Sequence, residues 1–113
     1  MATSEIKSNN GTYETLATNV ILQRFGRMRV LRLKSATYSD VSPLTLPVDD
    51  RPPEDIEFVG LKHYNGTHDT LGIGYVRTTG KIECRHFASY NGTAYSVVLP
   101  ATDQFIGEAI WEV

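Results

Sequence analysis

The chain has 113 residues, of which 41% are hydrophobic and 21% are charged. This composition is typical of one globular domain and argues against intrinsic disorder. The net charge of −2 excludes the strongly basic surface that nucleic acids and anionic membranes select. No apolar run approaches the roughly 20 residues of a membrane-spanning helix, so no membrane insertion is expected.

The N-terminal segment is polar, and its first 12 residues lack the apolar core of a signal peptide. We expect residues 1–17 to form a flexible segment or a linker, and residues 18–113 to form the folded β domain. Without a signal peptide, synthesis in a cytoplasm is expected.

Apolar residues in the rest of the chain recur with period two, which predicts β-strands. The first predicted hairpin joins residues 19–25 to residues 28–33 through a tight turn at Gly26. The apolar parity changes within the second of these strands, so we expect a bulge near Val30 and Leu31.

Later strands follow the same pattern, and turn residues separate them. The strands are predicted at residues 56–64, 71–77, 81–87, 95–99 and 105–113. Their turns are predicted at Asn65-Gly66, Thr78-Thr79-Gly80 and Asn91-Gly92. About seven short strands predict an all-β antiparallel sandwich or barrel with at most one short helical turn. The residues expected to be largely buried are Val20, Leu22, Phe58, Ile73, Val97 and Leu99.

Residues 46–58, with the sequence LPVDDRPPEDIEF, interrupt the strand pattern. Their three prolines lack N–H groups and fix φ, so no central strand can pass through this segment. Four carboxylates surround the single Arg51. We interpret the segment as a rigid crossover between sheets, with carboxylates that keep its outside in water.

Several predicted strands carry apolar residues on both faces. In residues 105–113, Phe105 and Trp111 share one parity, whereas Ile106 and Ile110 share the other. A single monomeric sandwich shows a cleaner alternation. The second face therefore either carries scattered surface residues, which are common, or packs against another subunit.

The sequence contains no catalytic or metal-binding constellation. The three histidines, His63, His68 and His86, lack metal-site spacing, so we expect them to lie at the surface or at a rim. The single Cys84 excludes an intrachain disulfide, and we interpret it as a small buried hydrophobe. The adjacent acidic pairs of residues 49–55 lie in one loop, unlike the facing carboxylates of a glycosidase. We therefore expect no enzyme activity and no cofactor.

Two predicted hairpin tips carry residue types that bind sugars. Aromatic rings stack on the C–H faces of a sugar, while amide, carboxylate and guanidinium groups bind its hydroxyls in pairs. The alternative is that these residue types are simply common near β-turns. Because loops on rigid β scaffolds often carry function, we take seven residues as a candidate saccharide site. They are Tyr64, His68, Asp69, Arg85, His86, Tyr90 and Asn91.

Four segments, in this order, resemble the C-terminal head domain of tailed-phage fibre and baseplate receptor-binding proteins. The segments are RFGRMRVLRL, LTLPVDDRPPEDIEFVG, GYVRTTGKIECRH and IGEAIWEV, and the resemblance covers about residues 18–113. It implies a β-sandwich or jelly-roll-like head, a homotrimer, and a place in the virion beside other tail or baseplate proteins. It also implies binding to a bacterial cell-surface saccharide during host adsorption. The alternative is a structural trimerising cap without a ligand.

Overall fold

The computed structural model describes residues 11–86 and 100–113, and it confirms the expected all-β, sandwich-like fold. The strands are β1 (Thr12–Ala17), β2 (Val20–Phe25), β3 (Met28–Thr37), β4 (Ile56–Glu57), β5 (Val59–Tyr64), β6 (Asp69–Val76), β7 (Ile82–His86) and β8 (Gln104–Glu112). Two short helical segments, α2 (Tyr38–Val41) and η1 (Val48–Asp50), exceed the single turn that we expected. The predicted strand at residues 95–99 and the predicted turn at Asn91-Gly92 lie outside the described residues.

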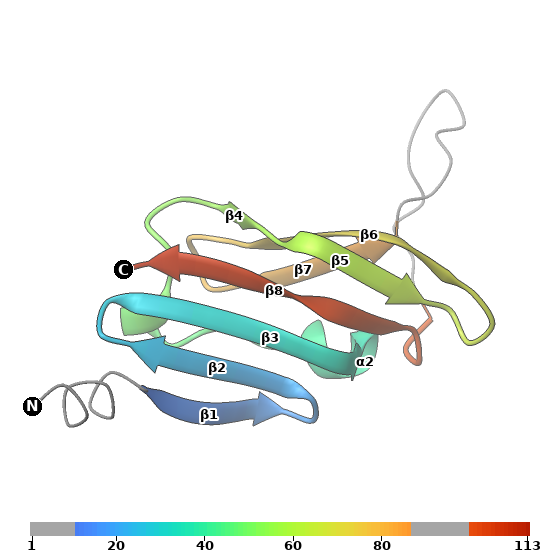
Figure 1. The fold of residues 1–113 in the computed structure, drawn as a ribbon, viewed down its shortest axis with the longest axis horizontal. Coiled ribbons are helices and arrows are strands. Elements are labelled where there is room, and N and C mark those ends of the chain that lie inside the picture. The colour runs from blue at the N-terminus through green and yellow to red at the C-terminus, as the bar shows by residue number, and fades with distance from the viewer. Residues whose placement is uncertain (1–10, 87–99) are drawn as a thin grey trace, which may run out of the picture.

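The strands form one antiparallel sheet that curls into a half-barrel (Figure 1). Along the sheet the order is β1, β2, β3, β8, β5 and β6. Strands β4 and β7 pair with the same residues of β6, so they lie on opposite edges of that strand. The last strand, β8, therefore occupies the middle of the sheet and joins the N-terminal strands to the second half of the chain.

The sheet begins before residue 18. Strand β1 pairs with β2 from Thr12 opposite Arg24 to Ala17 opposite Val20. The C-terminal end of β1 is half-buried, and its residues Leu16 and Ala17 pack against the core. We expected residues 12–17 to belong to a flexible segment, but they form an edge strand. Their apolar and polar residues alternate only weakly, and the strand is held by its pairing with β2 and by its packing on the core.

Two of the predicted turns depend on a glycine whose backbone has a positive φ, in the left-handed region of φ/ψ space. Gly26 has φ +58° and joins β2 to β3. Gly80 has φ +86°, and its N–H donates to the carbonyl of Arg77 to close the β6–β7 hairpin. Both turns lie where the sequence predicted them, as does the Asn65-Gly66 turn between β5 and β6.

The bulge expected near Val30 and Leu31 is wrong, because the β2–β3 register runs without a shift. The β1–β2 pair has an irregularity between Thr15 and Ala17, and two bulges lie beside β8. One is at Ser35 of β3, which has φ +61°, and the other is at Gly60 of β5, which has φ +66°. Both bulges flank the same part of β8, close to Ile106. Because bulges bend strands and increase twist, this pair accounts for the curling of the sheet around β8.

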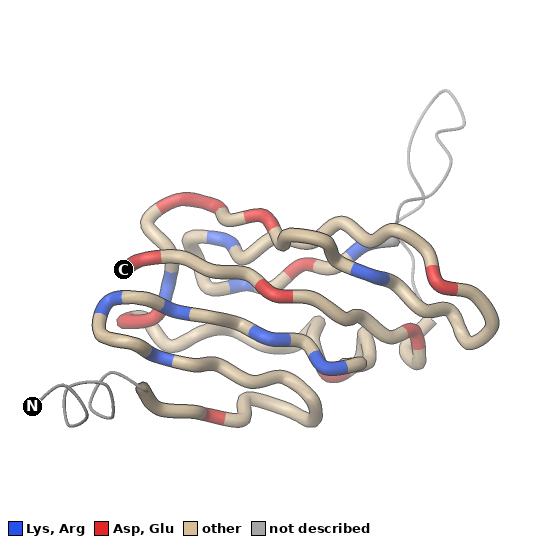
Figure 2. The backbone as a smooth tube through the Cα atoms, in the orientation of Figure 1, with Lys and Arg blue, Asp and Glu red and all other residues tan. Residues whose placement is uncertain are grey.

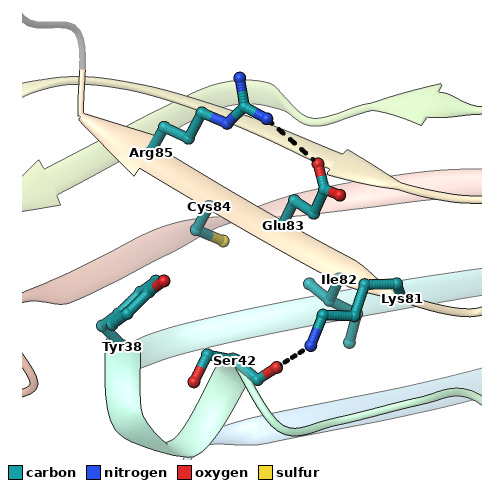
Figure 3. A pocket seen from close by; sticks show the side chains of 7 residues that line it. All are labelled: Tyr38, Ser42, Lys81, Ile82, Glu83, Cys84 and Arg85. Atoms are coloured by element: carbon teal, nitrogen blue, oxygen red, sulfur yellow. Dashed lines mark hydrogen bonds and ion pairs between the residues drawn. The ribbon is translucent and has the colours of Figure 1, made fainter. Parts of the chain in front are cut away.

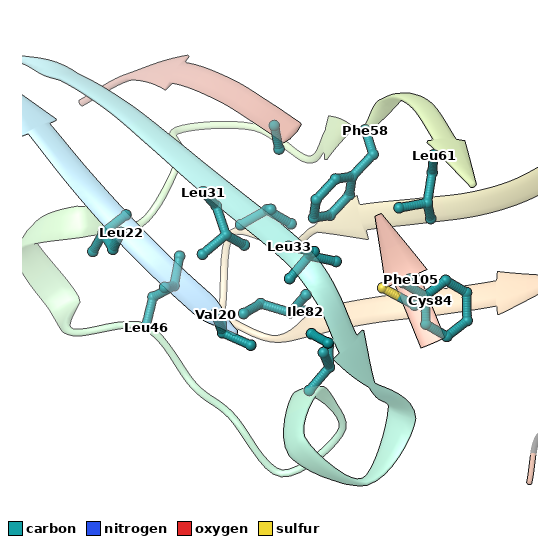
Figure 4. Packing of buried hydrophobic residues seen from close by; sticks show 14 of the residues in the cluster. Val20, Leu22, Leu31, Leu33, Leu46, Phe58, Leu61, Ile82, Cys84 and Phe105 are labelled. Atoms are coloured by element: carbon teal, nitrogen blue, oxygen red, sulfur yellow. The ribbon is translucent and has the colours of Figure 1, made fainter. Parts of the chain in front are cut away.

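The core lies on the inner face of the half-barrel, between β2–β3 and β6–β7 (Figure 4). Among the residues expected to be buried, Val20, Leu22 and Phe58 are buried. Ile73 is only half-buried, which contradicts our expectation. Its neighbours Gly72 and Gly74 face inward, where Leu61 fills the space that a Cβ would need. Val97 and Leu99 lie outside the described residues.

Candidate functional site

Residues 46–58 close one end of the half-barrel through Asp50, and only 3% of the surface of Asp50 is exposed. Arg24 donates to both carboxylate oxygens, at 2.9 Å and 2.7 Å, and Arg29 Nε donates to Oδ1 at 2.6 Å. Trp111 Nε1 donates to the Asp50 carbonyl at 2.8 Å. The hydrogen bonds from Arg24 hold the pKa of the Asp50 carboxyl below its ordinary value, while burial opposes this shift.

This geometry corrects the interpretation of the segment as a crossover with all its carboxylates in water. Asp49, Glu54 and Asp55 are exposed as expected, but Asp50 points into the barrel. The segment is also tied to the β6–β7 turn, because Leu46 N–H donates to the carbonyl of Gly80 at 2.9 Å. Asp50 therefore has a structural role in closing the barrel.

The β5–β6 tip brings together three of the predicted saccharide residues, Tyr64, His68 and Asp69. The Asn65 side-chain oxygen accepts hydrogen bonds from the N–H groups of Thr67 and His68, at 3.0 Å and 2.8 Å. His68 and Asp69 are exposed and Tyr64 is half-buried. These local hydrogen bonds fix the turn, so the three side chains lie on a preorganised surface.

Of the other predicted saccharide residues, Arg85 does not join this tip. Arg85 lies opposite Ile73, four residues from Asp69, or roughly 13 Å along β6. Its guanidinium faces Glu83 of its own strand at 3.4 Å. His86 occupies the last position of β7, opposite Gly72. Tyr90 and Asn91 lie outside the described residues, so their relation to the tip stays a prediction.

His63 is buried, which contradicts the expectation of a surface or rim histidine. Its Nε2 lies 2.6 Å from Oδ2 of buried Asp103, and its Nδ1 lies 2.8 Å from Oγ1 of Thr70. Its ring also packs against Phe105, with 5.1 Å between the ring centroids. No sequence pattern indicates this cluster, because 40 residues separate His63 from Asp103. The contacts join β5, β6 and the segment that leads into β8.

A shallow cavity of about 240 Å³ lies between α2 and β7 (Figure 3). Its walls include Tyr38, Arg85 and Cys84, and Lys81 Nζ donates to the carbonyl of Ser42 at its edge. Burial raises the pKa of the Cys84 thiol to about 12. The thiol is therefore protonated at neutral pH and is not a nucleophile. The interpretation of Cys84 as a small buried hydrophobe is confirmed.

The outer face of the sheet is unusually apolar. Of the seven large hydrophobic side chains that the described residues expose, six lie on this face by strand register. Only Val48, on η1, lies elsewhere. The six are Tyr13, Met28, Val59, Leu71, Ile106 and Ile110.

We define the outer-face patch as the central part of this surface, formed by Arg32, Val59, Ile106, Glu108 and Ile110. Val59 is 84% exposed and Ile110 is 52% exposed. Arg32 Nε donates to Glu108 Oε1 at 3.0 Å across β3 and β8. Figure 2 shows basic positions along β3 beside acidic positions along β8. The patch therefore surrounds one exposed ion pair with aliphatic side chains.

Comparison of the chain with protein-family models, with curated proteins and with solved structures finds no match. In the described residues no group of three or more His, Cys, Asp or Glu side chains could hold a metal ion. Nor does any helix in residues 11–86 and 100–113 have the length and apolarity to cross a membrane. The chemistry and geometry of the surface thus carry the functional argument.

Proposed function

We propose that this chain is a non-catalytic structural module that assembles with further copies of itself through the outer-face patch. In keeping with its resemblance to tailed-phage head domains, the module would serve in a fibre or baseplate. The observation that carries the proposal is the concentration of exposed hydrophobic side chains on one face of the sheet. Single exposed apolar residues are normal, whereas a contiguous group of them marks an interaction surface.

The magnitude of the hydrophobic effect supports this assignment. Full burial of a Val, Leu or Ile side chain is worth about 1.5–3 kcal/mol. Several such side chains together can offset part of the roughly 4–15 kcal/mol of lost freedom on association. The inner face is already filled by the core, so the outer-face patch has no partner among the described residues of its own chain.

Three paired titratable groups of the described residues have contacts that favour structural roles. Asp50 is bound by two arginines, His63 by Asp103, and Glu83 by Arg77. Each of these groups has a neighbour that fixes its position within the sheet. The proposal accordingly assigns none of them to catalysis.

Light scattering after size exclusion tests the proposal over a range of protein concentrations. The wild-type chain is expected to form assemblies, and Ile110→Asp is expected to be monomeric while it still unfolds cooperatively, at a melting temperature that no longer depends on concentration. Val48→Asp is the matched control, because Val48 is 72% exposed but lies on η1. A wild-type chain that stays monomeric at high micromolar concentration would refute self-assembly. The homotrimer implied by the resemblance is a different outcome of the same measurement, which reports the number of copies.

A second candidate function is binding of a bacterial surface saccharide at the β5–β6 tip. The observation in its favour is the grouping of Tyr64, His68 and Asp69 on a turn that Asn65 fixes. A rigid tip avoids part of the ordering cost of binding. Single-site affinity would be weak, about −4 to −8 kcal/mol, and several copies in one assembly would raise the avidity. A binding assay on host cell-wall polysaccharide tests this candidate.

A further inference from the structure

We infer that the outer-face patch joins two copies of this chain around a two-fold axis that runs parallel to the strands, between β3 and β8. This inference rests on the proposed self-assembly and specifies its geometry. In a two-fold contact the same surface is used by both copies, so each residue type must find its complement on that same surface. The patch meets this requirement in its charges, its apolar side chains and its shape.

The charges fix the direction of the axis. Arg32 and Glu108 lie side by side on β3 and β8, and their side chains are 39% and 46% exposed. An axis between these strands places Arg32 of one copy over Glu108 of the other, twice. Arg32 uses Nε for its own Glu108, and a guanidinium carries further N–H donors for a second carboxylate. An axis perpendicular to the strands would instead stack Arg32 on Arg32, which like-charge repulsion disfavours.

The same axis matches apolar residues with one another. Residues that pair across neighbouring strands share a row, and one row holds Ile21, Arg32, Glu108 and Val59. Rotation about the axis places Ile21 of β2 over Val59 of β5 in the second copy. The neighbouring row places Ile110 over Val30 in the same way. Val59 and Ile110 of the patch thus lie over aliphatic groups, although Val30 is only 9% exposed, whereas the row of Ile106 places Lys34 of the second copy over that side chain.

The shape of the patch also provides room for side chains of a second copy. A hollow of about 370 Å³ lies between β3 and β8 and is lined by Lys34, Ser35 and Ile106 among others. A second hollow of about 390 Å³ lies between β8 and β5, beside Val59 and Ile110. The hollows adjoin the bulges at Ser35 and Gly60. The two-fold axis directs Ile21 of the second copy toward the second hollow.

The area of the contact indicates a small, weak interface. Four central strands spaced about 4.8 Å apart span roughly 19 Å. Strand β8, with nine residues, is about 30 Å long. A flat rectangle of this size would bury about 600 Å² on each copy, but β2 flanks one half of β8, β5 flanks the other, and the sheet curls away from the patch, so the contact falls below the total of about 1,200 Å² of standard specific interfaces. We therefore expect an association that depends on concentration.

Cross-linking of two differently tagged variants tests the arrangement. Arg32→Cys and Glu108→Cys chains are mixed and treated with a bis-maleimide that spans the ~10 Å between packed sheets. The mixed dimer is the expected major product, because it retains one Arg32–Glu108 pair between copies. Each reaction is run with Cys84 present, since its thiol is buried and protonated, and again with Cys84→Ala. Val48→Cys replaces Arg32→Cys in the control mixture, which is expected to give no mixed dimer.

The outcomes separate this inference from the proposed function. Preferential cross-linking of Arg32→Cys with itself would overturn the axis, because the proposed contact places residue 32 directly over residue 108 and is weakened when both Arg32–Glu108 pairs between copies are lost. Assemblies that Ile110→Asp abolishes, but that give no mixed dimer or contain three copies, would also overturn the two-fold contact and leave self-assembly intact. A monomeric wild-type chain would overturn both.

Discussion

The indole Nε1 of Trp111 donates a 2.8 Å hydrogen bond to the main-chain carbonyl of Asp50, 61 residues earlier in the chain. The carboxylate of the same aspartate accepts hydrogen bonds from Arg24 on β2 and Arg29 on β3. A single residue of a proline-rich loop thus contacts three neighbouring strands, β2, β3 and β8. This arrangement makes Asp50 the residue whose change should most affect closure of the barrel.

Replacement of Asp50 by Asn is expected to lower the free energy of unfolding by about 3 kcal/mol, because it leaves two guanidinium groups without their carboxylate. Arg24 is 26% exposed, so water partly compensates its loss. Urea unfolding measures the effect. Asp49→Asn is the control, since Asp49 is exposed and should change stability by less than about 0.5 kcal/mol. Equal effects of the two variants would show that burial of Asp50 does not matter.

Acid should weaken the fold through the same carboxylate. Arg24 holds the folded-state pKa of Asp50 below the ordinary value of 3.8, so the folded chain binds this proton less readily than the unfolded chain. The contribution of Asp50 to stability is therefore complete above that value and is lost as pH falls through the lower folded pKa. Glu83, whose pKa Arg77 lowers, acts in the same direction.

We expect the stability of the wild-type chain to fall more steeply with decreasing pH than that of Asp50→Asn, below about pH 4. Urea unfolding at several pH values provides the comparison, and Asp49→Asn should follow the wild type. Parallel curves for wild type and Asp50→Asn would argue that Asp50 has the same proton affinity in both states.

Gly80→Ala should destabilise the chain more than Gly66→Ala, by about 1–3 kcal/mol. Both glycines have positive φ, so both changes introduce backbone strain. A Cβ at Gly80 would also lie 2.7 Å from Arg51 Nε and 3.0 Å from main-chain atoms of Leu46, whereas a Cβ at Gly66 meets nothing within 4 Å. Thermal melts of the two variants compare them directly. Similar melting temperatures would mean that residues 46–51 can move aside without loss.

If the β5–β6 tip binds a saccharide, Asp69→Ala and Tyr64→Ala should weaken binding to host cell-wall polysaccharide about tenfold or more, or roughly 1.4 kcal/mol. Arg85→Ala should bind like the wild type, because Arg85 lies four residues from Asp69 in the β6–β7 register. All three variants should melt normally, since these positions are half-buried or exposed. An effect of Arg85→Ala equal to that of Asp69→Ala would place the site farther along the sheet.

Local features of the sequence determined much of the fold. Period-two alternation predicted most of the strands, because successive side chains of a strand point to opposite faces. The turns at Gly26 and Gly80 were predictable, since glycine tolerates positive φ without steric cost. The grouping of Tyr64 with Asp69 was also predictable, because a tight hairpin places residues on either side of its turn opposite each other.

The pairing of residues across long separations, and the choice of the buried face of each strand, follow from the three-dimensional fold. The sequence predicted that Asp50 is in water and that His63 lies at the surface or at a rim. Both are buried, because Arg24 binds Asp50 and Asp103 binds His63, and these contacts offset the cost of removing the two side chains from water. Ile73 is not in the core as expected. Its neighbours Gly72 and Gly74 face inward instead, and Leu61 packs against them. Alternation defines two faces of a strand, but the register with distant strands determines which face packs inward.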